Sequence, residues 1–230
     1  EHKSGYHYVP DYFGRAAYKQ KDIRQLPVFG DLAAEVVKAG RASLYYDRLY
    51  TIYQLFLYLK SIARPGQSIN TIEAGVYKGG TSYFIASLAE SIDLKINHHC
   101  FDTFEGHAFE DINPAVETAH RPLFFNDTSY ESVSEYLGRF NYVNIYKGRF
   151  QDTSHHIENA QVHFVHLDMD IYEPTIFALK FLDKKLVKGG VILLDDYGFR
   201  ACPGIVKALG EFVVDNDRYF GMPLLSGQYI

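Results

Sequence analysis

The chain has 230 residues, of which 47% are hydrophobic, and it carries a formal net charge of −5. This length suits one α/β domain with an N-terminal elaboration, and a negative charge without a long basic run disfavours a nucleic-acid-binding surface. No apolar stretch reaches the roughly 18 residues that a membrane span needs. Cys100 and Cys202 are too few for a disulfide framework or a zinc cluster, so a reduced, cytoplasmic setting without membrane or nucleic-acid partners is expected.

Hydrophobic periodicity predicts helices first and then an alternation of strands and helices. Proline and glycine residues, which interrupt helices and strands, predict irregular structure for residues 1–27. Two helical patterns follow between residues 31 and 63, separated near Gly40. Strands are predicted at about 69–75, 96–102, 143–147, 162–168 and 190–195, and helices at about 80–92, 129–139, 153–159, 174–187 and 203–215. This alternation is typical of a Rossmann-like, doubly wound, mostly parallel α/β sheet. Residues 218–230 fit a closing antiparallel hairpin, which brings the expected sheet to seven strands.

The stretch 103–128 has two prolines and little periodicity. A loop that long in a compact domain is usually functional, so it is predicted to be a lid. The chain is therefore expected to be one domain, residues 1–230, with a helical elaboration at 1–65 and an α/β core at 66–230. The oligomeric state stays open, with a homodimer through the N-terminal helices as one arrangement.

A glycine-rich turn follows the first predicted strand. Gly75 and the pair Gly79-Gly80 let the backbone turn tightly, and the helix after them offers free amides to an anionic group such as a carboxylate. The spacing is neither that of a dinucleotide fingerprint nor that of a P-loop. Glu73 would repel a pyrophosphate and suits a cationic ligand, and Asp102, at the next strand end, is placed to accept ribose hydroxyls. A strand–helix turn without a ligand is the alternative.

Two aspartate pairs stand at the ends of apolar runs that are predicted to be buried strands. They are Asp168-Met-Asp170 and Asp195-Asp196. Carboxylates at buried strand ends are costly to desolvate unless something pairs with them, so four of them suggest a bound cation. Oxygen ligands favour a hard ion, Mg²⁺ or else Mn²⁺ or Ca²⁺. Capping of strand ends without a metal is the alternative.

Five segments occur in an order that carries a resemblance: EAGVYKGGTS, FDTFEG, GRFQDT, LDMDIYEPT and GGVILLDDYG. Together they resemble the class I S-adenosylmethionine-dependent methyltransferases. Within that superfamily the sequence is most similar to the macrocin O-methyltransferases, which methylate sugar hydroxyls on antibiotics. The resemblance covers about residues 40–215 and does not extend to residues 1–40.

The resemblance implies S-adenosylmethionine as cofactor, bound at the strand tips. By matching position, the methionine part would be surrounded by Glu73, Gly75, Tyr77, Gly79, Thr81 and, as a lesser candidate, Ser82. The ribose would lie at Asp102, Thr103 and Phe104, and the adenine at Phe150, Gln151 and Asp152. Asp168 is predicted to bind both the cofactor and the metal ion.

The superfamily's strand order would place the strand ending at Asp168 beside the one ending at Asp195. Asp168, Asp195 and Asp196 can then converge on one Mg²⁺, which two vicinal hydroxyls of the acceptor could chelate. The family position of Asp170 implies a general base. The acceptor is expected to be a glycosylated small molecule, methylated on a sugar of a natural product or glycan.

Two alternatives to this function remain. A metal-dependent phenol or catechol methyltransferase is disfavoured by Ile171, where the catechol enzymes carry lysine. A non-catalytic S-adenosylmethionine-binding protein is disfavoured by the intact aspartates. Among weaker candidates, His107 and His120 in the lid could contact the acceptor. Arg41 and Arg48 could face the cleft, although surface salt links are favoured for them. The remaining histidines are interpreted as surface or core residues: His98, His99, His155, His156, His163 and His166.

Overall fold

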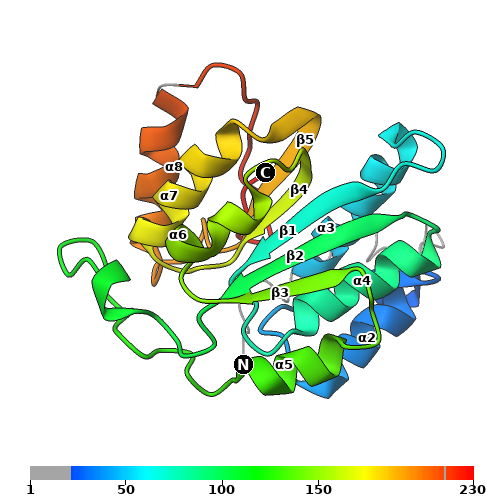
Figure 1. Cartoon of the computed structure of the whole chain (residues 1–230), viewed down its shortest axis with the longest axis horizontal. Coiled ribbons are helices and arrows are strands. Elements are labelled where there is room, and N and C mark those ends of the chain that lie inside the picture. The colour runs from blue at the N-terminus through cyan, green and yellow to red at the C-terminus, as the bar shows by residue number, and fades with distance from the viewer. Residues whose placement is uncertain (1–21, 215) are drawn as a thin grey trace.

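The computed structural model describes residues 22–214 and 216–230, and its centre is a five-stranded sheet (Figure 1). The strands are β1 (Ile69–Ala74), β2 (Ile96–Asp102), β3 (Val143–Lys147), β4 (Val162–Leu167) and β5 (Leu186–Leu194). Their order is β3-β2-β1-β4-β5, and every pairing between neighbours is parallel. The order reverses beside β1, so the carboxyl ends of β1, β2 and β4 meet where ligands of open α/β sheets bind.

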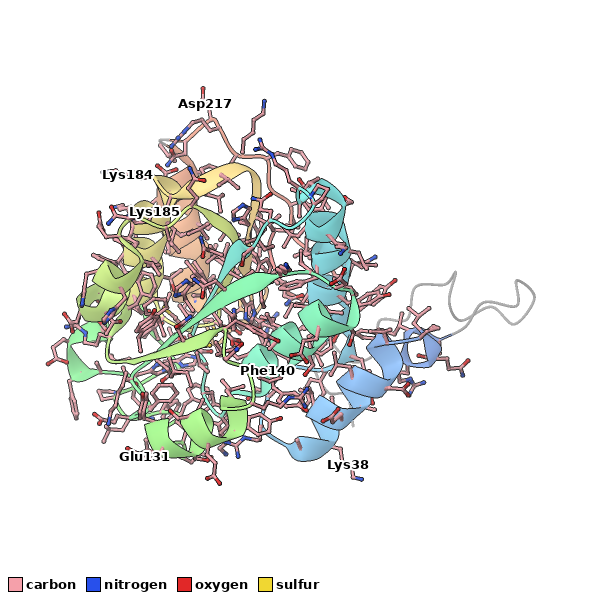
Figure 2. The ribbon with its side chains drawn as sticks, turned by 45° about the vertical axis from the view of Figure 1, so that its right-hand side comes forward. Lys38, Glu131, Phe140, Lys184, Lys185 and Asp217 are labelled. Carbon is pink, nitrogen blue, oxygen red and sulfur yellow. The ribbon has the colours of Figure 1, made fainter. Side chains whose placement is uncertain are left out.

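Helices cover both faces of the sheet (Figure 1). One face carries α2 (Phe29–Ala39), α3 (Tyr46–Ile62), α4 (Gly80–Ser91) and α5 (Tyr130–Leu137). The other carries α6 (Phe150–Thr153), α7 (Tyr172–Asp183) and α8 (Pro203–Val214). Short 3-10 turns lie at η2 (Ile23–Gln25), η3 (Phe109–Asp111) and η4 (Ser154–Ile157). Figure 2 shows Lys38 of α2 and Glu131 of α5 pointing outward, as expected for helices that bury only one side.

Two apolar clusters hold these layers together, one on each face. Phe29, Phe56 and Phe84 bring α2, α3 and α4 into one cluster that reaches Phe164 of β4. Opposite it, side chains of α6, α7 and α8 form the second cluster. The helical elaboration is thus packed directly on the sheet. The predicted break near Gly40 is confirmed, because Gly40 ends α2 in the left-handed conformation, at φ 65°.

The expectation of seven strands with a C-terminal antiparallel hairpin is wrong for the described residues. In place of a paired hairpin, Tyr229 makes isolated antiparallel bridges with Leu194 and with Pro223. Pro223 has no N–H to donate to a ladder, and the tight turn at Gly227 (φ 88°) leaves only a few residues on either side. The tail therefore fastens to the end of β5 without becoming a strand of the sheet.

Some boundaries differ from their predictions. The helix expected over 153–159 is instead α6 followed by η4, and the clearest difference lies before β5. The helix expected over 174–187 ends at Asp183, and β5 begins at Leu186 rather than at 190. Leu186 pairs with Val162, whereas Val191 pairs with Phe164, so residues 187–190 bulge out of the ladder. Gly189 takes φ 81° inside the bulge, which explains why the glycines suggested a strand start.

The segment 103–128 extends from the carboxyl end of β2 and contains only η3 (green in Figure 1). Backbone hydrogen bonds join His107 to Leu123 and Phe124, so its two arms run together. Residues 1–21, for which irregular structure was predicted, lie outside the described residues. Within the described ranges, no helix combines the length and the apolar character needed to cross a membrane.

Candidate functional site

A cleft with about 1010 Å³ of empty space, including the part open to solvent, lies at the carboxyl edge of the sheet. The structure brings together there many of the residues that the sequence singled out: Gly75, Tyr77, Thr81, Asp102, Thr103, Phe150, Asp168, Asp170 and Asp196. The other candidates are not among its lining residues: Glu73, Gly79, Ser82, Phe104, Gln151, Asp152 and Asp195. The segment before α3 also lines the cleft, with Arg41, Ala42, Ser43 and Leu44.

The glycine-rich turn after β1 packs closely against the backbone of two other segments of the chain. Gly75 has φ 92°, and a Cβ on it would collide with the carbonyl oxygen of Asp168. The amide of Gly80 donates to the carbonyl of Arg41 at 3.1 Å, and a Cβ there would lie 2.6 Å from the amide nitrogen of Ala42. These close approaches place the amino end of α4 at the cleft.

Asp102 shapes the same turn. One carboxylate oxygen accepts the amides of Val76 and Tyr77, each at 2.7 Å, and the other accepts the amide of Phe104 at 2.7 Å. Burial raises the pKa of Asp102, against the effect of these hydrogen bonds. A carboxylate has about four acceptor positions, so Asp102 keeps capacity for hydroxyls in the cleft that it lines.

Glu73 and Ser82 lie beneath the cleft in a buried polar chain. The hydroxyl of Ser82 donates to Glu73, and the other oxygen of Glu73 lies 3.2 Å from Nδ1 of His166. The opposite ring nitrogen of His166 lies 3.4 Å from Asp195. Burial opposes a charge on His166, but its hydrogen bonds to Asp195 and Glu73 raise the pKa to about 9. His166 is thus a buried cation between two carboxylates.

The residues after β3 divide between the cleft and the lid. Phe150 is buried and lines the cleft, with its ring 5.0 Å from that of Phe101 in an edge-on contact. Gln151 instead donates to Asp111 of the lid at 2.9 Å, and Asp152 is exposed. Of the three residues expected at the adenine, only Phe150 therefore lines the cleft.

An ion pair that the sequence did not indicate fastens the lid. Arg149 donates to both carboxylate oxygens of Asp111, at 3.0 and 2.6 Å, and Asp111 is buried. Two parallel hydrogen bonds of this kind fix geometry as well as charge. The signal for Arg149 was its position inside the GRFQDT segment, whereas Asp111 carried none in a loop without periodicity.

The four aspartates gather as predicted, but their environments differ. Burial, followed by repulsion from the neighbouring carboxylates, raises the pKa of Asp168 and Asp170 well above the usual range, and that of Asp196 to about 6. The pKa of Asp195 is lowered, because His166 and Arg48 outweigh its burial. Asp170 also holds a left-handed backbone at φ 63°, which is costly for a residue other than glycine.

Arg48 is a functional candidate whose favoured placement was wrong. Surface salt links were favoured over a position facing the cleft, yet Arg48 is buried, lines the cleft, forms an ion pair with Asp195 and lies 3.8 Å from Asp196. Its guanidinium stacks 4.2 Å above the ring of Phe199. Its position on the helix could have indicated burial, because Arg48 stands four residues before Ile52 and eight before Phe56 on the apolar stripe of α3.

The carboxylate cluster fits a divalent cation. Oδ2 of Asp196 is buried and has no hydrogen-bond partner among the described residues. Carboxylate oxygens of Asp168 and Asp195 lie within 4.8 Å of one another. Asp168 and Asp196 line the cleft, whereas Asp195 lies behind them and already accepts from Gln228 at 2.7 Å and from Arg48. Oxygen donors with so little compensating charge suit a hard ion.

The histidines separate into core and lid groups. His98, His99 and His166 are buried in the sheet, as core histidines were expected to be, and His155 is exposed. His107 lines the cleft with His120 beside it, their nearest ring nitrogens 3.0 Å apart.

Comparison with known proteins agrees with the sequence motifs. The model of a family described as macrocin-O-methyltransferase (TylF) matches residues 49–218. A curated relative, 8-demethyl-8-(2,3-dimethoxy-alpha-L-rhamnosyl)-tetracenomycin-C 4'-O-methyltransferase of Streptomyces olivaceus, is 26% identical over 155 residues. That match covers 63% of this chain and 59% of the relative, so the chain spans less than two thirds of the relative's length.

Solved structures share the fold. The O-methyltransferase NovP superposes with a TM-score of 0.65 at 23% identity, over 77% of this chain and 75% of NovP. CalS11, a calicheamicin methyltransferase, gives a TM-score of 0.62 at 18% identity, over 82% of this chain and 79% of CalS11. The Rossmann-like α/β methyltransferase fold expected from the sequence is confirmed, with the number of strands corrected to five among the described residues.

Proposed function

Because the chain belongs to the macrocin-O-methyltransferase family, we propose that it transfers a methyl group from S-adenosylmethionine to a sugar hydroxyl of a natural product or glycan. The observation that carries this proposal is the cleft, which joins the glycine turn after β1 to the aspartates after β4 and β5. The Streptomyces olivaceus relative is named as a rhamnosyl-tetracenomycin 4'-O-methyltransferase, and this supports a sugar acceptor.

The cofactor lies across the tips of β1, β2 and β3 in this proposal, and it supplies the electrophilic methyl group. Gly75, Tyr77 and Thr81, which line the cleft, would hold its methionine part, with the carboxylate near the amino end of α4, where Gly79 is the N-cap residue. Asp102 accepts the ribose hydroxyls, and Phe150 covers the adenine. Glu73 and Ser82 act from below, by fixing the strand end through their buried hydrogen bond.

The aspartate cluster is the acceptor side of the proposed reaction. Asp168, Asp195 and Asp196 would hold Mg²⁺, or another hard divalent ion. Such an ion supplies a Lewis acid that lowers the pKa of an acceptor hydroxyl and accommodates a vicinal diol. Arg48 and His166 limit repulsion among these carboxylates, through their contacts with Asp195.

Asp170 takes the hydroxyl proton in this proposal. It lines the cleft two residues beyond Asp168, so it is within reach of a hydroxyl held at the cluster. Phe124 and Phe125 of the lid also line the cleft and exclude water from it. S-adenosylmethionine, when bound, would supply the methyl group and leave as S-adenosylhomocysteine, and the residues of the cleft would contribute to the rate by positioning the acceptor hydroxyl.

The test is a methyl-transfer assay over a panel of glycosides and nucleotide sugars, with phenols and catechols alongside, with and without EDTA. Calorimetry with S-adenosylhomocysteine measures cofactor binding separately. We expect turnover of a sugar diol that EDTA abolishes and Mg²⁺ restores. Turnover of catechols alone would favour the phenol-type enzyme, and cofactor binding without any turnover would favour a binding protein. Turnover indifferent to EDTA would exclude the metal role.

A further inference from the structure

A second group of metal-ligating side chains lies beside the aspartate cluster, and of its members the proposed reaction uses only Asp170. His107 and His120 come from the two arms of the lid, and Asp170 comes from the loop between β4 and α7. One ligand atom from each of these three residues lies within 4.8 Å of the other two. Cys202 adjoins them, with its sulfur 3.4 Å from Nε2 of His120 and 3.7 Å from Oδ1 of Asp170.

The spacing suits a transition metal ion. Ligand atoms of a tetrahedral zinc site stand about 3.4 Å apart, because each bond is about 2.0–2.3 Å long. The ring nitrogens of His107 and His120 are 3.0 Å apart. Burial, together with repulsion from His120, lowers the pKa of His107 to about 4, so its ring is neutral and free to ligate near pH 7. Two imidazoles with a carboxylate favour Zn²⁺ or Fe²⁺ over Mg²⁺.

The fold holds the two histidines together. The amide of His107 donates to the carbonyl of Phe124 at 3.0 Å, and the amide of Leu123 donates to the carbonyl of His107 at 2.9 Å. The ring of Phe125 packs 5.5 Å from His107 and 6.2 Å from His120. Leu123 and Phe125 both take positive φ to make this turn. Backbone pairing thus brings residues 13 positions apart to one point above Asp170.

We infer that His107, His120 and Asp170 form a second cation site, for Zn²⁺ or a similar transition metal ion, which binds the lid to the floor of the cleft. Cys202 is the neighbouring side chain that such an ion would also meet. The consequence for catalysis rests on the proposed function: an ion bound here occupies the proton-accepting carboxylate and holds the lid down. Zn²⁺ is therefore an inhibitor of an enzyme that Mg²⁺ supports.

Cobalt is the probe that tests the site without any need for turnover. The EDTA-treated full chain, returned to excess Mg²⁺ to saturate the aspartate cluster, is titrated with Co²⁺ and followed by visible absorption. We expect one equivalent to develop the intense bands of low-coordinate cobalt, with micromolar or tighter affinity. Weak octahedral absorption throughout the titration would overturn the inference.

Variants locate the ion. His107→Asn with His120→Gln should weaken cobalt binding at least about 100-fold, because two of three ligands are lost. The single variant His120→Gln provides the same test with less disturbance of the lid, and circular dichroism confirms that both variants fold. His155→Gln, at an exposed histidine that does not line the cleft, should bind cobalt as the wild type does. Undiminished absorption in both lid variants would refute the site.

Activity gives a second, separable readout. With saturating Mg²⁺, added Zn²⁺ should inhibit methyl transfer by the wild type and by His155→Gln at the concentration at which cobalt binds. His120→Gln should require at least about 10-fold more. Equal inhibition of all three would contradict the inhibitory role. If no acceptor is turned over, the proposed function fails while the cobalt titration still decides whether the site exists.

Discussion

At the scale of single residues, Asp170 is the strictest test of the proposed reaction. Asp170→Asn keeps the shape and tolerates a left-handed backbone, but it cannot take a proton. We expect kcat to fall about 10²- to 10⁴-fold, while the affinity for S-adenosylhomocysteine changes little. Steady-state assay and calorimetry measure the two quantities. Asp93→Asn is the matched control, because Asp93 is an exposed carboxylate that also has positive φ, at 52°. Equal kcat values in the two variants would remove Asp170 from its role.

Arg48 makes a second prediction, on stability. It is the buried guanidinium that faces Asp195 and Asp196, so Arg48→Met leaves buried carboxylates without their partner. We expect the free energy of unfolding to fall by about 3–5 kcal/mol in urea titrations without divalent ions. Arg139→Met is the control, since Arg139 pairs with Glu90 on the surface at 3.2 Å, and its loss should cost about 1 kcal/mol or less. Similar losses in both variants would show that the buried pair contributes no more than the exposed one.

At the scale of elements, the turn between β1 and α4 depends on Gly75. Gly75→Ala forces a side chain into a left-handed backbone and against the carbonyl of Asp168. We expect cofactor affinity to fall at least about 10-fold and the melting temperature to drop, because the turn must move away from β4. Calorimetry and thermal unfolding monitor both effects.

Gly210→Ala is the control for that prediction, with the opposite sign. Gly210 lies within α8, and a Cβ there would have no neighbour within 4 Å. Alanine at an open helical position should raise the free energy of unfolding by about 0.5–1 kcal/mol. If both glycine variants lose stability equally, the collision at Gly75 is not the cause.

The same scale shows what the sequence could predict. Strands β1 to β4 agree with the predicted ranges to within a residue or so, because each is an apolar run bounded by turn residues or by acids. The start of β5 was missed because Gly189 and Gly190 lie inside a bulge. The strand order implied by the resemblance placed Asp168, Asp170 and Asp196 together, and these three residues line one cleft, since the carboxyl ends of parallel strands meet at one edge.

Contacts between distant segments could not be predicted in this way. Arg149 with Asp111, and Arg48 with Asp195, join residues 38 and 147 positions apart, and no local pattern encodes such a pairing. Likewise, Gln151 matched the family position for adenine but turns to the lid. Resemblance gives a residue a position on the fold, whereas tertiary packing decides which neighbour its side chain bonds to.

At the scale of the whole molecule, buried histidines set the response to acid. Burial lowers the pKa of His98 to about 3, and repulsion from His99 and His166 adds to the effect. An unfolded histidine has a pKa near 6.5, so below that pH the unfolded chain binds a proton that the native one refuses. The contribution of His98 to stability is therefore full above about pH 6.5 and is lost as the pH drops toward 3.

Urea unfolding between pH 7.5 and 4.5 measures this dependence. Each such histidine contributes a slope of up to about 1.4 kcal/mol per pH unit below pH 6. His98→Gln keeps a polar group near Thr71 and Ser82, which bond the imidazole at 2.8 and 3.1 Å, but it cannot be protonated. For His98→Gln, we expect the slope of the free energy of unfolding against pH to be smaller by the contribution of about one proton, whereas His155→Gln keeps the wild-type slope. Identical slopes would show that His98 is not responsible.

The buried chain from Glu73 through His166 and Asp195 to Arg48 has a consequence for redesign of this enzyme. It crosses from β1 through β4 to the end of β5 and on to α3, so four segments share one charge balance. Changing one member alone leaves a buried charge without its partner, whereas replacing the whole set by apolar side chains of similar volume can leave the free energy of unfolding unchanged. A mutant library that seeks a new acceptor should therefore leave these four positions unchanged, and sample lid positions such as Phe124 and Phe125 one at a time.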